Sequence, residues 1–234
     1  MKRRNLTIQM IPVCSLVFLS ALLIVGLGNK AITVMSPHTY SLEKHWIIID
    51  AGHGGVDGGA TSCTGILESQ LNLEIALRLD DLMHLLGYRT KMIRSEDVSI
   101  YTEGTTIAAK KISDLKERVR IANGTENAVL LSIHQNYFAD GRYSGAQVFY
   151  SRHPDSEKMG KSLQADLVKS LNPGSNRQAK IATGIYLMEH IQCPGVLIEC
   201  GFLSNTTEAE KLRTPEYQKR LCAVLAAGVA RFLS

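Results

Sequence analysis

The chain has 234 residues, of which 45% are hydrophobic and 21% charged, and its formal net charge is +4. This length is sufficient for one sizeable α/β domain or two small ones, and the composition is that of an ordinary globular protein. The small positive charge, part of which comes from an N-terminal Lys2-Arg3-Arg4 cluster, does not indicate nucleic acid binding.

The first 28 residues differ from the rest of the chain. A basic start is followed by an apolar run from Met10 to Leu27, close to the ~18–20 residues that span a bilayer. Basic residues before such a run favour a cytoplasmic start and export of the body. We therefore predict a membrane anchor at 1–28, with a cleaved signal as the alternative, a linker at 29–44 and a folded domain at 45–234. Either way the protein is exported, and it is membrane-anchored or secreted.

From residue 45 onward, strand and helix patterns alternate. The apolar run HWIIID (45–50) is typical of a strand buried on both faces, and residues 69–86 place leucines at helical spacing before Gly87. The remaining expected elements are strand 88–94, helix 115–123, strands 127–134 and 145–151, helix 156–171, strand 195–200 and helix 215–233. This order predicts an α/β, three-layer fold with a mostly parallel, twisted sheet and helices on both faces.

Polar residues stand at the ends of three expected strands. His53 follows the first strand, while His134 and Glu199 close two later ones, and Glu68 begins the first helix. In such sheets the carboxyl ends of the strands form the working rim. Two histidines and a carboxylate are a common catalytic zinc set, which leaves a position open for water, and a second glutamate can take a proton from that water. Each residue alone has a structural interpretation, but together they favour a metal site.

The glycine-rich stretch after the first strand does not fit a nucleotide-binding loop. Gly52-His53-Gly54-Gly55-Val56 is followed by Asp57, where a dinucleotide fingerprint requires glycine, and no Gly-Lys-Ser/Thr sequence is present. No G-x-S-x-G motif indicates a serine hydrolase. We therefore expect neither a nucleotide nor a serine nucleophile.

The five cysteines, Cys14, Cys63, Cys193, Cys200 and Cys222, form no C-x-x-C pair and show no zinc-ribbon spacing. Their spacings are unlike a disulfide framework, so buried free thiols are expected. Cys200 adjoins Glu199 on a strand, where neighbouring side chains point to opposite faces, and is expected to pack in the core. Cys63 lies in a short polar loop and could be exposed.

Four ordered segments resemble the motifs of zinc-dependent N-acetylmuramoyl-L-alanine amidases of the amidase-3 type. These are IIIDAGHGGVDGGA (47–60), Glu68 before LNLEIALRL, SIHQN (132–136) and VLIECGFLSN (196–205). The segments TKMIRSED, LKERVRIAN and GAQVFYS also match, so the resemblance covers about Trp46 to the C-terminus. It implies hydrolysis of the amide between the lactyl group of N-acetylmuramic acid and L-alanine of the peptidoglycan stem peptide.

The resemblance also implies roles for individual residues. By motif position, His53, Glu68 and His134 would bind one zinc ion, and Glu199 would be the catalytic acid and base. Asp50, three residues before His53, is a candidate either to orient a ligand or to cap the turn, and the sequence favours neither.

The interval from His134 to Glu199 is too short for the regulatory helix that blocks the site in some division amidases. The chain is therefore most similar to the sporulation-specific members of the family, which act on spore cortex as a step toward the muramic-δ-lactam read during germination. Without an insertion of its own, dependence on an activating partner protein is a further hypothesis. The alternatives are a zinc peptidase acting on wall peptides and a non-catalytic wall-binding module.

Overall fold

The computed structural model describes residues 44–234. The segment predicted as a membrane anchor or signal (1–28), with Cys14, and nearly all of the predicted linker (29–44) lie outside the described residues. None of the helices between residues 44 and 234 has both the length and the apolar character that a membrane span requires.

A six-stranded sheet forms the centre of the fold, in the order β2-β1-β3-β6-β4-β5. Strands β2, β1, β3 and β6 are parallel, whereas β4 is antiparallel to β6 and β5 is parallel to β4. The expectation of a mostly parallel sheet is confirmed, with two strands at one edge running the opposite way. The strands are β1 Trp46–Ala51, β2 Arg89–Met92, β3 Ala128–Asn136, β4 Gln147–Tyr150, β5 Lys180–Ile181 and β6 Gly195–Phe202.

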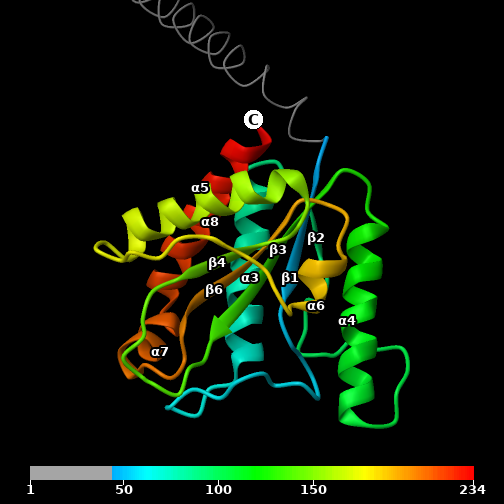
Figure 1. Ribbon diagram of the computed structural model, residues 1–234, viewed down its shortest axis with the longest axis horizontal. Helices are drawn as coiled ribbons and strands as arrows, with labels where there is room; N and C mark the ends of the chain where they lie inside the picture. Colours follow the sequence, from blue (N-terminus) through cyan, green and yellow to red (C-terminus); the bar gives the residue numbers. More distant parts are fainter. Residues whose placement is uncertain (1–43) are drawn as a thin grey trace, which may run out of the picture. The chain divides into compact units, whose positions relative to one another are not determined.

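Helices cover both faces of this sheet, as expected for three layers (Figure 1). Helices α3, α5 and α8 pack on one face, and α4 and α6 pack on the other. Helix α7 follows β6 and contacts both that strand and α8. The helices are α3 Glu68–Leu85, α4 Ile107–Asn123, α5 Pro154–Leu171, α6 Tyr186–His190, α7 Thr206–Leu212 and α8 Pro215–Leu233.

The apolar run of β1 is continuous because its side chains are buried on both faces. Ile47 and Ile49 belong to the core beneath α3, α5 and α8, whereas Ile48 belongs to the smaller core beneath α4 and α6. All three are fully buried. Alternation of side chains along a strand therefore assigns each residue of the central strands to one of two cores.

The same alternation places the polar residues of β3 and β6. Leu130 and Leu197 lie in the core beneath α4 and α6, so Ser132, His134 and Glu199, at even spacing beyond them, project to the same face. His134 and Glu199 are direct neighbours in the parallel pairing of β3 with β6. The face covered by α4 thus carries apolar side chains at one end and polar side chains at the other.

Several elements differ from the expected ones. Helix α4 begins at Ile107, eight residues before the expected 115–123 segment, because Thr106 caps it by accepting a hydrogen bond from the Ala109 amide. The short elements β5, α6 and α7 were not expected, since each is too brief to show periodicity. Helix α8 has the expected bounds, with Thr214 as its cap and Pro215 in its first turn.

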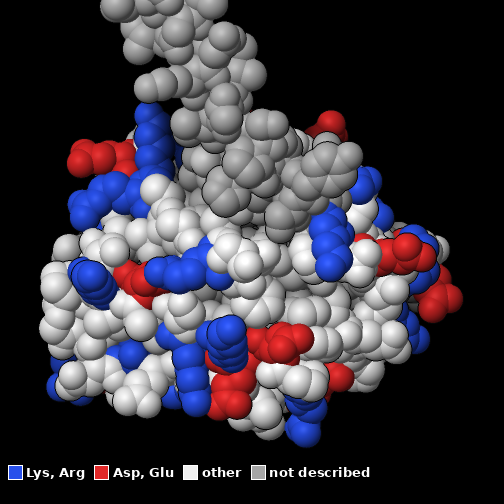
Figure 2. Space-filling view, turned by 90° about the horizontal axis from the view of Figure 1, so that it is seen from above, with Lys and Arg blue, Asp and Glu red and all other residues white. Residues whose placement is uncertain are grey.

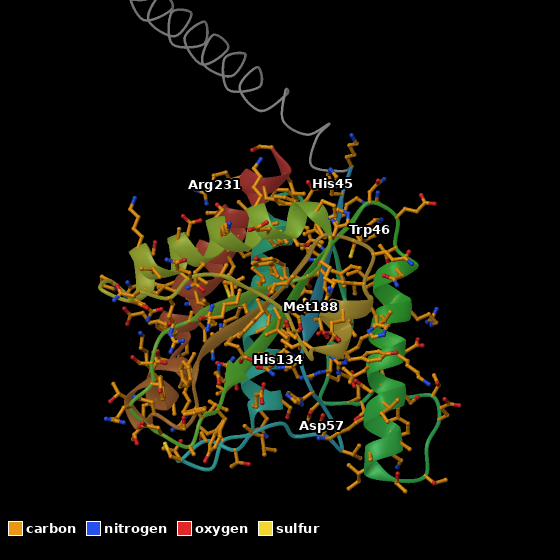
Figure 3. The ribbon with its side chains drawn as sticks, in the orientation of Figure 1. His45, Trp46, Asp57, His134, Met188 and Arg231 are labelled. Carbon is orange, nitrogen blue, oxygen red and sulfur yellow. The ribbon has the colours of Figure 1, made fainter. Side chains whose placement is uncertain are left out.

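Charged side chains of both signs are interspersed on the face of the molecule seen from above (Figure 2). This is the end at which Trp46 begins β1, whereas His134 and Asp57 lie toward the opposite end (Figure 3). His134 and Asp57 therefore do not lie on the face seen in Figure 2.

Glu208 of α7 is buried, and its Oε2 accepts hydrogen bonds from the amides of Gly145 (2.8 Å) and Phe202 (3.0 Å). We expect Glu208→Ala to lower the free energy of unfolding by at least about 2 kcal/mol, because two buried N–H groups would lose their acceptor. Urea denaturation measures this. Glu210→Ala is the matched control, since that exposed side chain contacts only Arg213, and it should leave the midpoint almost unchanged. Equal midpoints for the two variants would contradict the assigned role.

Candidate metal centre

His53 occupies a strained turn directly after β1. Its φ of 61° lies in the left-handed region, which costs a non-glycine residue about 1–3 kcal/mol and is found mainly at functional sites. Its Nδ1 is 2.9 Å from Oδ2 of Asp57, and Oδ1 of Asp57 is 2.7 Å from the Lys111 ammonium. These contacts fix the orientation of the ring and leave Nε2 directed at Glu68, 3.3 Å away.

Two buried arginines bind the backbone that carries His53. Arg94 donates to the carbonyls of Ala51 (2.8 Å) and Gly52 (3.0 Å), and Arg118 donates to those of Ala51 (2.9 Å) and His53 (2.7 Å). Both guanidinium groups are nearly inaccessible to solvent. Three consecutive carbonyls are therefore satisfied by side chains from distant parts of the chain, which stabilises the unusual turn.

Asp50 has a structural role that differs from both of the roles considered for it. Its carboxylate pairs with Arg118 and accepts a hydrogen bond from Ser132 Oγ (2.6 Å). Burial alone would raise the pKa of Asp50, but the Arg118 charge and the Ser132 hydroxyl hold that pKa below its usual value. Asp50 is therefore ionised and anchors Arg118 beneath the His53 turn.

Glu68, the first residue of α3, brings the two histidines together. Its Oε1 lies 3.0 Å from Nδ1 of His134 and accepts the Gln135 amide at 3.1 Å, while Oε2 accepts the Ala60 amide at 3.0 Å and faces His53. Burial would raise the pKa of Glu68, but the hydrogen bonds from His134 and His53 lower it far below its usual value. The group is a carboxylate at any physiological pH.

The donor atoms of His53, Glu68 and His134 lie within 4.8 Å of one another, so one ion can contact all three. The two imidazole rings meet edge to face, with centroids 5.0 Å apart. Two imidazole nitrogens and one carboxylate oxygen match the donor set of catalytic zinc sites, which keep a fourth position for water or substrate. The residues present therefore fit zinc.

Glu199 stands beside this cluster without joining it. It is the cross-strand neighbour of His134, and its Oε2 is one of three buried side-chain polar atoms in residues 44–234 that have no hydrogen-bond partner. Burial raises the pKa of Glu199 to about 7, an effect that the nearby histidines partly oppose. A carboxyl group with this pKa can both accept and donate a proton near neutral pH.

A cavity of about 380 Å³ opens over His53, His134 and Glu199, between α4 and the segment that precedes α6. Its polar wall includes His53, His134 and Glu199, and its apolar wall includes Leu115 and Ile185. A substrate amide in this cavity can therefore reach the metal ligands and Glu199 together.

The structure brings together all four residues singled out in the sequence. Sequence reasoning missed Arg94, Arg118 and Lys111, although the first two lie in the matching segments TKMIRSED and LKERVRIAN. The remaining cysteines are free thiols: Cys63 is exposed, Cys193 is half-buried, and Cys200 and Cys222 are buried.

Comparison with known proteins identifies the family. The model of the amidase-3 family, N-acetylmuramoyl-L-alanine amidase, matches residues 47–231, and the chain therefore belongs to this family.

Individual relatives support this assignment. The chain is 38% identical over 200 residues to the germination-specific N-acetylmuramoyl-L-alanine amidase of Bacillus subtilis (strain 168), a match that covers 85% of this chain and 84% of the relative. The CwlD amidase of Clostridioides difficile, solved in complex with the GerS lipoprotein, has 36% identity and a TM-score of 0.77 over 80% of this chain and 98% of its own. The catalytic domain of CwlV from Bacillus (Paenibacillus) polymyxa var. colistinus has 25% identity and a TM-score of 0.66, over 81% and 98%. The resemblance and the α/β fold are thus confirmed.

Gly52 provides a test of the close packing around His134. A Cβ at this position would overlap the His134 ring, so Gly52→Ala should displace that ring and weaken zinc binding by at least about tenfold. Competition with a chromogenic chelator measures the affinity. Gly58→Ala in the same loop is the control, because its Cβ would first meet a flexible Leu67 methyl at 3.2 Å. Unchanged affinity in Gly52→Ala would show that the ring does not need this space.

The pKa of His53 predicts opposite effects of pH on stability and on zinc binding. Burial would lower this pKa, but hydrogen bonds to Asp57 and Glu68 raise it to about 9 in the metal-free protein. The protonated ring therefore stabilises the metal-free fold fully below pH 6.5, and this contribution is lost as pH rises through 9. Zinc requires the neutral ring, so zinc affinity should rise over the same interval.

Thermal unfolding and calorimetric titration between pH 6 and 10 test this prediction. His53→Gln is the reference, because the pKa of Glu199 is also about 7. The contribution of Glu199 to the pH profile is present in both proteins and can be subtracted. Zinc binding should release a proton in wild-type protein at pH 7.5, and the loss of stability between pH 6.5 and 9 in the metal-free wild type should be absent in metal-free His53→Gln. Identical pH profiles for the two proteins would contradict the assigned protonation state.

Proposed function

We propose that this protein hydrolyses the amide between the lactyl group of N-acetylmuramic acid and L-alanine of the peptidoglycan stem peptide. The observation that carries the proposal is the half-buried Glu199 side chain, whose buried Oε2 has no hydrogen-bond partner in residues 44–234, beside the His53, Glu68 and His134 donors. A metal site alone fits many activities, whereas this arrangement within an amidase-3 chain fits amide hydrolysis.

The three donor residues would hold one zinc ion. When bound there, zinc supplies the Lewis acidity that activates water and polarises a carbonyl. Asp57 keeps the proton of His53 on Nδ1, so that Nε2 is the donor atom, and Lys111 in turn holds Asp57 in place. Glu68 receives two backbone amides, which keep its oxygens in position between the histidines.

Glu199 would transfer the proton. Its pKa of about 7 lets it accept a proton from the attacking water at neutral pH. It then donates that proton to the leaving nitrogen of L-alanine, which departs as a neutral amine. Since Oε2 of Glu199 has no competing hydrogen-bond donor within residues 44–234, the carboxyl is available for both transfers.

The cellular role proposed is cleavage of spore cortex peptidoglycan, as a step toward the muramic-δ-lactam needed for germination. The similarity to a germination-specific amidase supports this role. Residues 1–28 would direct export, with the enzyme membrane-anchored or secreted. An activating partner protein is part of the proposal, supported by the CwlD amidase having been solved with the GerS lipoprotein.

Analysis of the products tests the reaction. Incubation of intact peptidoglycan with the zinc-loaded protein should release peptides that begin with L-alanine and leave unsubstituted muramic acid, which mass spectrometry detects. Cleavage inside the stem peptide would indicate a zinc peptidase instead. Binding to wall material without any cleavage, in the presence of zinc and partner, would indicate a wall-binding module.

Glu199→Gln separates catalysis from metal binding. The variant keeps the shape of the side chain but cannot accept a proton, so we expect turnover to fall by roughly 10²–10⁴-fold. Zinc content, measured by mass spectrometry of the metal, should stay at one ion per chain, because Glu199 is not a ligand. Glu68→Gln, by comparison, should lose zinc as well as activity. Full turnover in Glu199→Gln would refute the mechanism.

A further inference from the structure

A second hollow lies across β6 and β4 from the metal cavity. It measures about 460 Å³ and is lined by Tyr143, Gln147, Asn176, Arg177, Gln178 and Lys180. Gln147, which lines this hollow, is the antiparallel pairing partner of Glu199, which lines the metal cavity. Directly paired residues have Cα atoms roughly 5 Å apart, and their side chains share a face. The second hollow therefore begins one strand away from the catalytic carboxyl.

Two cations line this hollow without a carboxylate partner. Arg177 donates from Nε to the Ser144 carbonyl (2.9 Å), reaches Oε1 of Gln147 from Nη1 (3.5 Å) and lies over the ring of Phe202, 4.8 Å from its centroid. Lys180 is exposed on β5. Within residues 44–234, neither side chain forms an ion pair.

The two hollows differ in the charged side chains that line them. The metal cavity is lined by carboxyl groups and by two cations, Lys111 and Arg118, that pair with its three aspartates, which leaves Glu199 as its unpaired carboxyl group among the described residues. The second hollow is lined by two cations that are unpaired within residues 44–234 and by no acidic side chain. The fixed position of the Arg177 guanidinium, between a carbonyl, an amide and an aromatic ring, favours binding of a planar anion. A ligand that passes over Glu199 and carries a carboxylate would meet complementary charge there.

We propose that Arg177 and Lys180 bind the free α-carboxylate of the second residue of the stem peptide, a γ-linked glutamate. This inference rests on the proposed function, and it assigns the second hollow as the binding site for the peptide part of the substrate. On the two sides of the scissile amide, the glycan side is uncharged and the peptide side is anionic, so charge assigns the peptide to the cationic hollow.

The spacing agrees with this assignment. The Cα atoms of Glu199 and Gln147 are about 5.5 Å apart as a directly paired couple, and Nη1 of Arg177 lies 3.5 Å from Oε1 of Gln147, so Arg177 is the second neighbour of Glu199 across the sheet. Two extended residues span at most about 7 Å, and a charged hydrogen bond adds about 3 Å. A carboxylate on the second residue can therefore reach Arg177 while the scissile nitrogen lies at Glu199.

The test compares two soluble muropeptides with the full-length, zinc-loaded protein. One carries the free glutamate carboxylate, and in the other that group is amidated. For wild type we expect a KM roughly tenfold to a hundredfold lower for the free acid and a similar kcat for both substrates. Arg177→Gln and Lys180→Gln should raise KM for the free acid only, and Arg177→Lys should restore part of the preference.

Lys158→Gln, an exposed lysine of α5, is the control for loss of a positive charge and should behave as wild type. Lys180→Gln should fold as wild type does, because Lys180 is exposed and forms no ion pair within residues 44–234. An effect of this variant on KM therefore cannot be attributed to misfolding. Equal KM values of wild type for the two substrates, or an unchanged preference in both variants, would overturn the proposal.

Calorimetric binding of both muropeptides to the same proteins separates this inference from the proposed function. If neither muropeptide is cleaved at the lactyl amide in the presence of zinc and the partner protein, the proposed function fails. In that case, tighter binding of the free acid that depends on Arg177 and Lys180 still supports the carboxylate site, and equal binding overturns it.

Discussion

The metal centre depends on how two buried arginines satisfy the backbone at the end of β1. Arg94 and Arg118 donate to the carbonyls of residues 51–53, which would otherwise be buried acceptors in an irregular turn. Asp50 supplies the opposite charge, since a buried guanidinium without a carboxylate would carry a large desolvation cost. With its carbonyl held in this way, His53 can keep a left-handed backbone and present Nε2 to Glu68.

In the proposed mechanism, the separate roles of metal ligand and base follow from sheet geometry. His134 and Glu199 are paired on adjacent strands and project to one face, so their side chains are neighbours. Oε2 of Glu199 nevertheless has no hydrogen-bond partner within residues 44–234. Glu68 comes from a helix and approaches the histidines from another direction. Two glutamates at one site thereby have opposite electrostatic surroundings: hydrogen bonds keep Glu68 ionised, and burial raises the pKa of Glu199 to about 7.

The sequence predicted the features that rest on local patterns. Continuous apolar strands and the periodic α8 revealed the layered fold, and polar residues at strand ends revealed His53, His134 and Glu199. Interactions between distant segments were not predictable in this way. In the sequence, Arg118 cannot be distinguished from a solvent-exposed arginine of a helix. Its role is visible only in the fold, where its side chain contacts Asp50, Ala51 and His53. Likewise, the reversed direction of β4 depends on its pairing with β6, fifty residues later in the chain.

A crystal structure of the zinc-loaded protein, with anomalous data at the zinc edge, tests the central claim most directly. The account predicts that one zinc ion would be bound by His53, Glu68 and His134. Glu199 should lie close by without ligating the ion, and the carbonyls of residues 51–53 should still accept from Arg94 and Arg118. Zinc ligated by Glu199, or a His53 turn released from both arginines, would contradict it.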